Sequence, residues 1–357
     1  MDNRVSLVSP RLDSKPWGGR KLGRYGLALP LGEPIGEALI TAGEAVVSTG
    51  YLAGQTLGQI VEADPSARLG ATAHDAVGGR PVFPLLVKLI DAGGNLSIQV
   101  HPDDSQAAHL DRLGKTEAWH ILEADPGSVL YLGIRPGVSL AEFQEAATRL
   151  DGSSARMMRT VPARPGTTVL IPAGTVHALG AGVMVYEVQQ PSDITYRLDD
   201  WGRVDAEGNP REVHLDAGFA VAQLQSIPEL ISPVSLRPAI GERHLLAACR
   251  PFALERIALP RGGSLEISKS GSLGVVTMLE GEANVNDLRI GRGSSAVVWP
   301  SKRPSILTAL EPCVALVSWV PDLMPDIVEP AIRAGADPQT VAALGGATGD
   351  LHQAMRP

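Results

Sequence analysis

The segment Arg164-Pro-Gly-Thr-Thr-Val-Leu-Ile-Pro-Ala-Gly-Thr-Val-His177 has a counterpart later in the chain, Gly291-Arg-Gly-Ser-Ser-Ala-Val-Val-Trp-Pro-Ser-Lys-Arg-Pro-Ser305. Each runs from a glycine through a short apolar stretch to a proline. Each also follows a similar segment, Ile121-Leu-Glu-Ala-Asp125 in the first case and Met278-Leu-Glu-Gly-Glu282 in the second. Such an internal repeat predicts two related β-barrels in tandem. The second copy has Ser305 in place of His177, so the two barrels are expected to differ in their chemistry.

The rest of the chain also favours a mainly β protein. Its 39 glycines and 28 prolines are scattered between short apolar runs, as they are between strands and tight turns. We expect strands at residues 84–90, 96–101, 117–122, 128–132, 167–171, 183–189 and 194–198. The first two are expected to pair as a hairpin through the turn-forming residues 92–95.

A few helices are expected between these strands. Ser139 and Glu142 have the spacing of a capping box at the start of a helix over 139–150. A second helix is expected near 105–113, and a third over 337–344, where Asp337 precedes a proline. The predicted organisation is a catalytic barrel with a helical insertion at 1–225, a second barrel that binds no metal at 226–321, and a partly helical tail at 322–357.

Polar residues alternate along several of the predicted strands. Because side chains in a strand point alternately to the two faces of a sheet, Ser97, Gln99 and His101 share one face. The same period groups other polar residues: Lys115, Glu117 and Trp119; Glu187 and Gln189; Thr195 and Arg197. A polar barrel interior costs free energy unless its groups are hydrogen-bonded or bind a ligand. The pattern therefore predicts a shared polar lumen.

A metal ion would explain why imidazoles and a carboxylate are placed there. His nitrogen and Glu oxygen are ordinary Zn²⁺ ligands, and an incomplete protein shell leaves room for water or substrate. His101 or His177 alone would more often be an ordinary buried or turn histidine. Together with Gln99 and Glu117, at matching alternation, they predict one metal site.

Composition excludes several classes of protein. No apolar run approaches the ~18–20 residues of a membrane helix, and the first ten residues do not resemble an export signal, so a cytoplasmic location is expected. Cys249 and Cys313 fit reduced packing residues better than a disulfide. The net charge of −8 argues against nucleic acid as a partner. A phosphorylated metabolite remains compatible, because one phosphate needs only a few local cations.

Several motifs give the chain a resemblance to a known family. They are Pro16-Trp-Gly-Gly19, Ile35-Gly-Glu-Ala38, Leu96-Ser-Ile-Gln-Val-His-Pro-Asp-Asp104, Gly114-Lys-Thr-Glu-Ala-Trp119, Ile171-Pro-Ala-Gly-Thr-Val-His-Ala178 and Tyr186-Glu-Val-Gln-Gln-Pro-Ser-Asp-Ile-Thr-Tyr-Arg-Leu-Asp-Asp200. With these motifs the chain, over roughly residues 10–320, resembles the type I mannose-6-phosphate isomerases in their shorter bacterial form, which belong to the cupin superfamily of jelly-roll barrels. It departs from the pattern at His120, where an aromatic such as Tyr is expected, and in the tail beyond Pro321.

The resemblance implies a set of site residues and an activity. It implies one Zn²⁺ per chain, held by Gln99, His101, Glu117 and His177. It also implies catalytic roles for Arg197, Glu187 and Lys115, and substrate binding by Lys88, Ser97 and Trp17. The implied reaction interconverts mannose 6-phosphate and fructose 6-phosphate through an enediol. The expected partner is a small sugar phosphate, bound by a monomer or weak homo-oligomer.

The residue types fit this chemistry without assigning every role. Moving a proton between C1 and C2 needs a base and stabilisation of the enediolate. Arg197 suits either the developing anion, which we favour, or the phosphate. Lys115 or Lys88 suits the phosphate or ring opening, and Glu187 is the candidate base. Two alternatives remain at this point, namely an Fe²⁺-dependent cupin oxygenase and a sugar-phosphate-binding cupin without catalysis.

Overall fold

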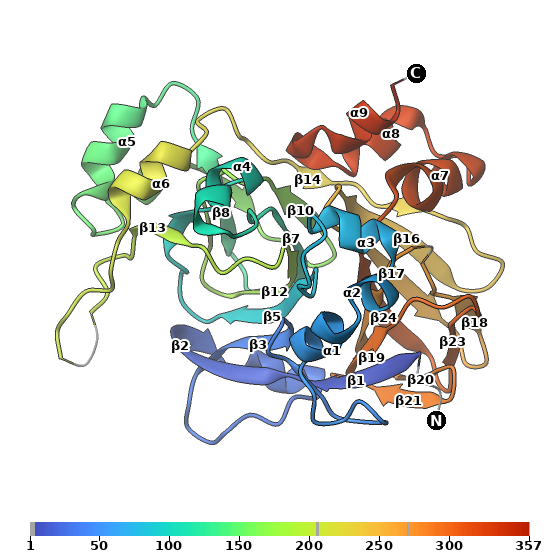
Figure 1. The fold of residues 1–357 in the computed structure, drawn as a ribbon. Coiled ribbons are helices and arrows are strands. Elements are labelled where there is room, and N and C mark those ends of the chain that lie inside the picture. The colour runs from blue at the N-terminus through green and yellow to red at the C-terminus, as the bar shows by residue number, and fades with distance from the viewer. Residues whose placement is uncertain (1–3, 205–206, 270, 357) are drawn as a thin grey trace.

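The computed structural model describes residues 4–204, 207–269 and 271–356. Figure 1 shows two β-rich halves side by side, with helices over and between them. The first half, here called the first sandwich, has a seven-stranded and a five-stranded sheet. In sheet order the larger contains β14 (Leu230–Ile231), β10 (Thr168–Ile171), β7 (Glu117–Ala124), β12 (Val183–Gln189), β5 (Leu86–Ala92), β2 (Arg11–Gly19) and β3 (Ile35–Thr41). The smaller contains β13 (Tyr196–Asp199), β6 (Ile98–Val100), β11 (His177–Leu179), β8 (Val129–Ile134) and β9 (Met158–Pro162).

The second sandwich is built from an eight-stranded and a four-stranded sheet. The larger contains β15 (Val234–Ser235), β16 (Glu242–Ala248), β17 (Ala253–Leu259), β24 (Cys313–Trp319), β19 (Gly274–Glu280), β22 (Ser295–Val298), β1 (Val5–Ser9) and β4 (Val46–Val47). The smaller contains β18 (Ser264–Glu266), β23 (Ile306–Ala309), β20 (Glu282–Val285) and β21 (Leu288–Gly291).

The two sandwiches repeat the same strand order. The run β10-β7-β12-β5 in the first large sheet matches β22-β19-β24-β17 in the second, and β6-β11-β8-β9 matches β18-β23-β20-β21 in the small sheets. A β-bulge recurs at the same place, since the pairing shifts beside Ile121 in β7 and beside Met278 in β19. The predicted mainly β fold with a tandem repeat is confirmed, and the bulge aligns the two copies residue by residue.

The predicted hairpin between residues 84–90 and 96–101 is wrong. Both strands exist, but β5 pairs with β12, β2 and β3, whereas β6 pairs with β11 and β13 in the other sheet. The turn between them therefore crosses from the large sheet to the small one. Ile90 and Leu96 both enter the apolar core between the two sheets, so the crossing buries apolar residues from both ends of the turn.

Each predicted helix is present, although shorter than expected. The segment α5 (Leu140–Ala147) begins after Ser139, which forms the expected capping box with Glu142. The segment α4 (Asp104–Ala107) continues as a 3₁₀ helix, and α8 (Pro338–Ala343) begins after Asp337, whose carboxylate accepts from Thr340 N at 2.9 Å. The sequence prediction missed α1 (Leu57–Ala63), α2 (Pro65–Leu69), α3 (Ala71–Ala76), α6 (Leu215–Val221), α7 (Glu329–Arg333) and α9 (Asp350–Ala354).

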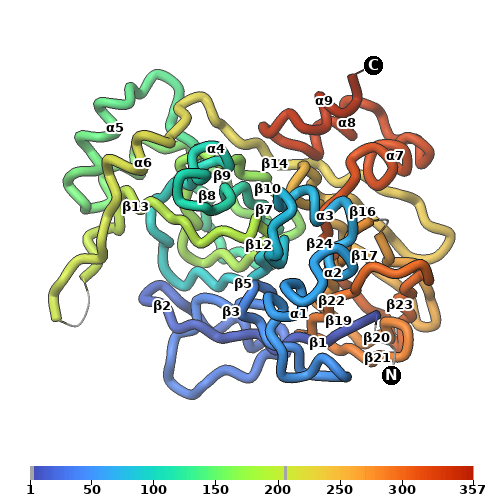
Figure 2. The backbone as a smooth tube through the Cα atoms, in the orientation of Figure 1, coloured from blue at the N-terminus to red at the C-terminus, as the bar shows by residue number. Residues whose placement is uncertain are grey.

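Strands cross between the two halves of the chain. The backbone trace in Figure 2 shows the N-terminal strand β1 among the late strands of the second sandwich, where Val5 pairs with Val298 of β22. In the opposite direction, Ile231 of β14 pairs with Thr168 of β10. The division of the chain at 225 and 321 stays a prediction, and these pairings cross its first boundary. Among the described residues, no helix has the length and hydropathy needed to span a membrane.

Candidate metal centre and active site

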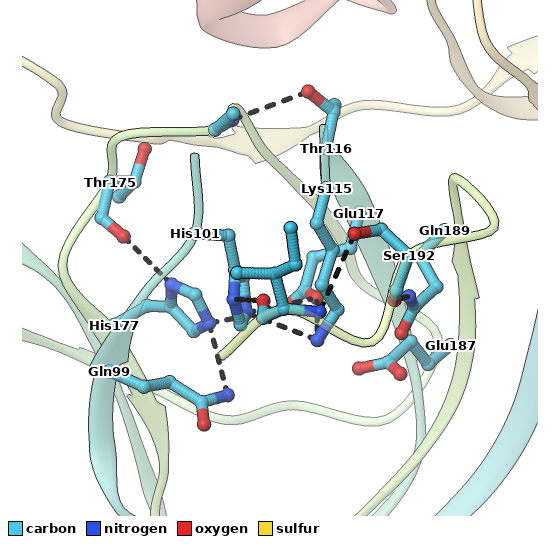
Figure 3. Close-up of polar contacts among 12 residues, drawn as sticks. Gln99, His101, Lys115, Thr116, Glu117, Thr175, His177, Glu187, Gln189 and Ser192 are labelled. Atoms are coloured by element: carbon cyan, nitrogen blue, oxygen red, sulfur yellow. Dashed lines mark hydrogen bonds and ion pairs between the residues drawn. The ribbon is translucent and has the colours of Figure 1, made fainter. Parts of the chain in front are cut away.

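Three buried side chains converge inside the first sandwich. His101 follows β6, Glu117 begins β7 and His177 begins β11, so the two sheets contribute to one point. Their ligand atoms all lie within 4.8 Å of one another. His177 Nε2 is 3.2 Å from Glu117 Oε1, and His101 Nε2 is 3.6 Å from Glu117 Oε2. Figure 3 shows the imidazoles turned toward the same space. This geometry is suitable for a metal ion.

Backbone carbonyls orient both imidazoles. His101 Nδ1 lies 2.8 Å from Ile194 O, and His177 Nδ1 lies 2.8 Å from Thr175 O. A carbonyl only accepts, so each Nδ1 carries a proton and each Nε2 is the nitrogen turned toward the cluster. Burial, followed by the charge of Lys115, holds the pKa of His101 well below its usual range. The imidazole of His101 is therefore neutral, as metal ligation requires.

Glu117 is a buried, ionised carboxylate that faces Lys115 and the two imidazoles. Burial acts to raise its pKa, but the charge of Lys115, with smaller effects of His177 and His101, outweighs burial and holds the pKa well below the usual range. Neither carboxylate oxygen has a hydrogen-bond donor. A buried charge without hydrogen bonds is costly, so this arrangement fits a bound cation. The donor set of two imidazoles and one carboxylate suits Zn²⁺ or a similar divalent ion.

Gln99 lies beside the cluster but presents its nitrogen to it. The amide Nε2 is 3.4 Å from His177 Nε2, and the amide Oε1 accepts from Ser97 Oγ at 3.3 Å. Turning the amide by 180° would present Oε1 to the imidazole instead, since the two amide ends have nearly the same shape. Gln99 is thus placed beside the cluster, and its role as a fourth ligand stays a prediction.

Two lysines face the buried carboxylates. Lys115 Nζ is 3.1 Å from His101 Nε2 and 3.3 Å from Glu117 Oε2. Lys88 Nζ is 3.6 Å from Glu187 Oε1, across the β5–β12 pairing, and 3.8 Å from Glu37 Oε2. Burial acts to lower the pKa of Lys88, but the neighbouring carboxylates raise it overall. Lys88 is therefore a charged group rather than a neutral amine.

Glu187 is the second buried carboxylate of the site. Its Oε2 accepts from Trp119 Nε1 at 2.9 Å, whereas its Oε1 has no hydrogen-bond donor. Burial raises the pKa of Glu187, and the nearby charge of Glu117 raises it further. The pKa of Glu187 is thus raised while that of Glu117 is lowered. Two carboxylates whose pKa values are shifted in opposite directions usually have separate chemical roles.

A cavity of about 460 Å³ opens above the cluster. Seven of the sequence-predicted site residues line it: Trp17, Lys88, Ser97, Gln99, Lys115, Glu187 and Arg197. The other three, His101, Glu117 and His177, lie buried against it. Arg197 pairs with Gln99 across β13 and β6 and donates from Nη1 to Glu212 O at 2.6 Å. A cavity of this size accommodates a small phosphorylated sugar.

The sequence prediction missed several residues of the cavity wall, among them Arg11, Asp13, Lys15, Glu37, Ser192 and Arg211. Glu37 lies within the Ile35–Ala38 motif, so strand alternation in that segment would have identified it. Arg211 lies in an irregular segment between β13 and α6. No periodic signal marks such a residue, because its position depends on long-range contacts.

Comparisons with known proteins identify the family to which the chain is similar. The model of the family described as phosphomannose isomerase type I, catalytic domain, matches residues 6–120. The mannose-6-phosphate isomerase ManA of Bacillus subtilis is 32% identical over 299 residues, which cover 80% of this chain and 88% of the relative. The mannose-6-phosphate isomerase of Streptococcus mutans is 31% identical, with 78% and 86% covered. The crystal structure of the Bacillus subtilis mannose 6-phosphate isomerase superposes with a TM-score of 0.75 at 26% identity, covering 88% of this chain and 99% of that one.

Proposed function

The chain belongs to the type I mannose-6-phosphate isomerases, and we propose that it interconverts mannose 6-phosphate and fructose 6-phosphate at one Zn²⁺ ion. The observation that carries this proposal is the buried carboxylate of Glu117, which is ionised, lacks a hydrogen-bond donor and faces two imidazole nitrogens. The proposed ligands are Gln99, His101, Glu117 and His177. When bound, the ion would polarise the substrate oxygens as a Lewis acid.

Glu187 is the proposed base. The reaction removes the proton from C2 of the aldose, forms an enediolate, and returns a proton to C1. Oε1 of Glu187 accepts no hydrogen bond, so it is available to take this proton. Trp119 Nε1 donates to Oε2 and holds that oxygen in place. A raised pKa makes the carboxylate a stronger base than an exposed glutamate, which supports this role.

The proposed role of the cations is to balance negative charge. Lys115 reaches His101 and Glu117, and it would assist ring opening by donating a proton to the ring oxygen. Lys88 forms ion pairs with Glu187 and Glu37. Arg197 faces the cavity beside Gln99, where its guanidinium would stabilise the enediolate.

Substrate contacts are proposed for Ser97 and Trp17, together with Lys88. Ser97 Oγ lies next to the Gln99 amide, and Trp17 is almost completely buried in the cavity wall. A flat indole face and a hydroxyl are suited to the apolar and polar sides of a sugar. We further propose that the protein acts in the cytoplasm as a monomer or weak homo-oligomer.

A coupled assay of mannose 6-phosphate conversion tests the proposal directly. Enzyme should be measured as purified, after chelation and after Zn²⁺ or Fe²⁺ is restored, together with His177→Ala and the control His352→Ala on the exposed face of α9. We expect activity to disappear on chelation, to return with Zn²⁺, and to be absent only in the His177 variant. A protein with one bound metal and no turnover would instead favour a binding cupin.

A further inference from the structure

Arg211 lines the cavity, and the proposed chemistry gives its charge no role. Two other cations of the cavity wall also have no role there, but both are paired with carboxylates: Arg11 with Asp13 and Glu44, and Lys15 with Glu37. We propose that Arg211 binds the phosphate group of the sugar phosphate, and that Asp200 fixes the guanidinium for this purpose. Arg211 is thus a specificity-determining residue, and Asp200 a positioning residue. This inference rests on the proposed function, because it assigns the non-reacting end of the same substrate.

The two lysines nearest the metal cluster are already balanced by carboxylates. Lys88 lies between Glu187 and Glu37, and Lys115 lies against Glu117. A phosphate dianion placed beside either lysine would also approach these buried carboxylates. Like charges at such short range are strongly unfavourable where water is excluded. The lysine end of the cavity is therefore a poor place for a phosphate.

The opposite end of the cavity has an excess of positive charge. Asp200 accepts hydrogen bonds from Arg203 and Arg211. Arg197 lies near this group, since the charges of Arg211, Asp200 and Arg203 all affect its pKa. Two guanidiniums thus contact one buried carboxylate, and a third, that of Arg197, lies nearby without contacting it. Of the three, Arg197 and Arg211 line the cavity. A phosphate with a charge near −2 would neutralise this group.

The hydrogen bonds of Arg211 to Asp200 use only one edge of its guanidinium, which leaves the other edge for a ligand. Nε donates to Asp200 Oδ2 at 2.6 Å and Nη2 donates to Asp200 Oδ1, so one edge of the guanidinium is held bidentately. Within the described residues, Nη1 of Arg211 makes no hydrogen bond. The side chain is 30% exposed, compared with 7% for Lys115 beside the metal cluster. Arg211 thus lines the cavity as a more exposed residue than Lys115, and Asp200 occupies only one edge of its guanidinium. The other edge has the geometry that recognises phosphate bidentately.

The backbone places Arg211 beyond Arg197 as seen from the metal cluster. Arg197 pairs with Gln99, and the segment after Arg211 runs alongside it: Arg197 Nη1 donates to Glu212 O, and His214 N donates to Arg197 O at 2.7 Å. The reacting carbons of a hexose 6-phosphate are C1 and C2, and the phosphate is at the far end of the molecule. The metal cluster and Arg197 would thus face the reacting carbons C1 and C2, and Arg211 would face the phosphate.

The test compares Arg211→Ala and Arg211→Lys with the control Arg203→Ala, which changes the other arginine on Asp200 without touching the cavity. For each protein, KM and kcat are measured with mannose 6-phosphate, and the dissociation constant of inorganic phosphate is measured by calorimetry. We expect Arg211→Ala to raise both KM and the phosphate dissociation constant about 10- to 100-fold, the effect of one lost charged hydrogen bond, with kcat changed less than about threefold. Arg211→Lys should lie between, and Arg203→Ala should stay within about threefold of the parent.

Three results would overturn the inference: an unchanged phosphate dissociation constant in Arg211→Ala, a fall in kcat with KM unchanged, or an equal weakening in Arg203→Ala. Arg211→Lys keeps a charge beside Asp200, so it remains informative if the alanine variant does not fold. Calorimetry with inorganic phosphate needs no turnover. Absence of isomerase activity in the parent would therefore count against the proposed function, and the phosphate titrations would still decide the role of Arg211.

Discussion

Lys88 and Glu255 occupy the same position in the two sandwiches with opposite charge. Lys88 in β5 pairs with Glu187 in β12, and Glu255 in β17 pairs with Val317 in β24. The shared bulge aligns these strands, so the correspondence does not depend on a choice of register. The lysine beside the proposed base in one sandwich is a carboxylate beside an apolar residue in the other.

The interior around Glu255 is filled by charges that neutralise one another. Its carboxylate accepts from Arg243 Nε at 2.8 Å and from Lys269 Nζ at 2.7 Å. The Lys269 ammonium also lies 3.5 Å from the centroid of the Trp319 ring. Gly274 begins β19 where Glu117 begins β7. An ion-pair network thus occupies the region that corresponds to Lys88 and Glu187, and a glycine stands where Glu117 does in the first sandwich. That the second sandwich binds no metal stays a prediction.

Replacing Glu255 by Gln should destabilise the protein without affecting the active site. The change leaves Arg243 and Lys269 buried with one carboxylate fewer, and breaking a buried ion pair from one side costs about 3–5 kcal/mol. We expect the free energy of unfolding, measured in urea, to fall by about 3 kcal/mol, while metal content and KM stay unchanged.

The matched control is Glu242→Gln on the neighbouring strand β16. Glu242 is 63% exposed and lies 3.3 Å from Arg256, so its loss should cost less than about 1 kcal/mol. Equal losses in the two variants would show that the Glu255 network is no more important than a surface pair.

His120 should make the protein less stable in mild acid. Burial, with a smaller effect of Arg256, lowers the pKa of His120 to about 4, whereas an unfolded histidine titrates near 6.5. Between these values the unfolded chain binds a proton that the folded chain does not, so stability falls as the pH drops through this window. The histidine should account for a loss of about 2 kcal/mol between pH 7 and pH 5.

The measurement compares urea unfolding of the parent and His120→Gln at both pH values. Gln retains a polar group for Thr168 Oγ1, which lies 2.9 Å from His120 Nδ1. We expect the variant to lose about 2 kcal/mol less than the parent on acidification. Parallel losses in both proteins would assign the acid sensitivity to other groups.

A hydrogen bond between the two large sheets should couple the sandwiches. Tyr186 Oη of β12 lies 2.9 Å from Ser318 Oγ of β24, and both side chains are buried. We expect Tyr186→Phe to lower the free energy of unfolding by about 1 kcal/mol, because it leaves the serine without its partner. A double-mutant cycle with Ser318→Ala should give a coupling energy of about 0.5–1.5 kcal/mol. Additive effects would mean that the two hydroxyls do not depend on each other.

Much of the fold and site could be predicted because the relevant signals are local. Strand alternation grouped Gln99 with His101, and the repeated segments revealed the tandem sandwiches. The family motifs then indicated that His177 belongs to the same site as His101 and Glu117, although the three residues lie on strands far apart in the sequence. The α1 helix was also within reach, since Thr56 and Gln59 form a capping box that was overlooked.

The parts that could not be predicted depend on long-range pairing. Nothing in residues 92–95 distinguishes a hairpin turn from one that crosses between sheets, and nothing in Val5–Ser9 indicates a partner almost 300 residues away. Arg211 is similar, because its place in the cavity depends on Asp200 and on the path of an irregular segment. These contacts follow from the packed fold rather than from periodicity.

Glu117→Gln and Glu187→Gln should separate metal binding from proton transfer. Both residues are buried carboxylates in one site, so the two substitutions are matched in size and charge. Glu117→Gln removes the anionic ligand, and we expect it to lose both the metal and the activity. Glu187→Gln removes only the proposed base, and we expect it to keep one metal per chain while kcat falls about 10²- to 10⁴-fold.

Metal content by elemental analysis and melting temperature with and without chelator provide the readout. A ligand that binds only the folded chain stabilises it by about 2.7 kcal/mol at 100 times its dissociation constant, so chelation should lower the melting temperature of the parent and of Glu187→Gln. Glu117→Gln should melt at the same temperature with or without chelator. If Glu187→Gln lost its metal as well, Glu187 would belong to the metal site and the base would have to be sought elsewhere in the cavity.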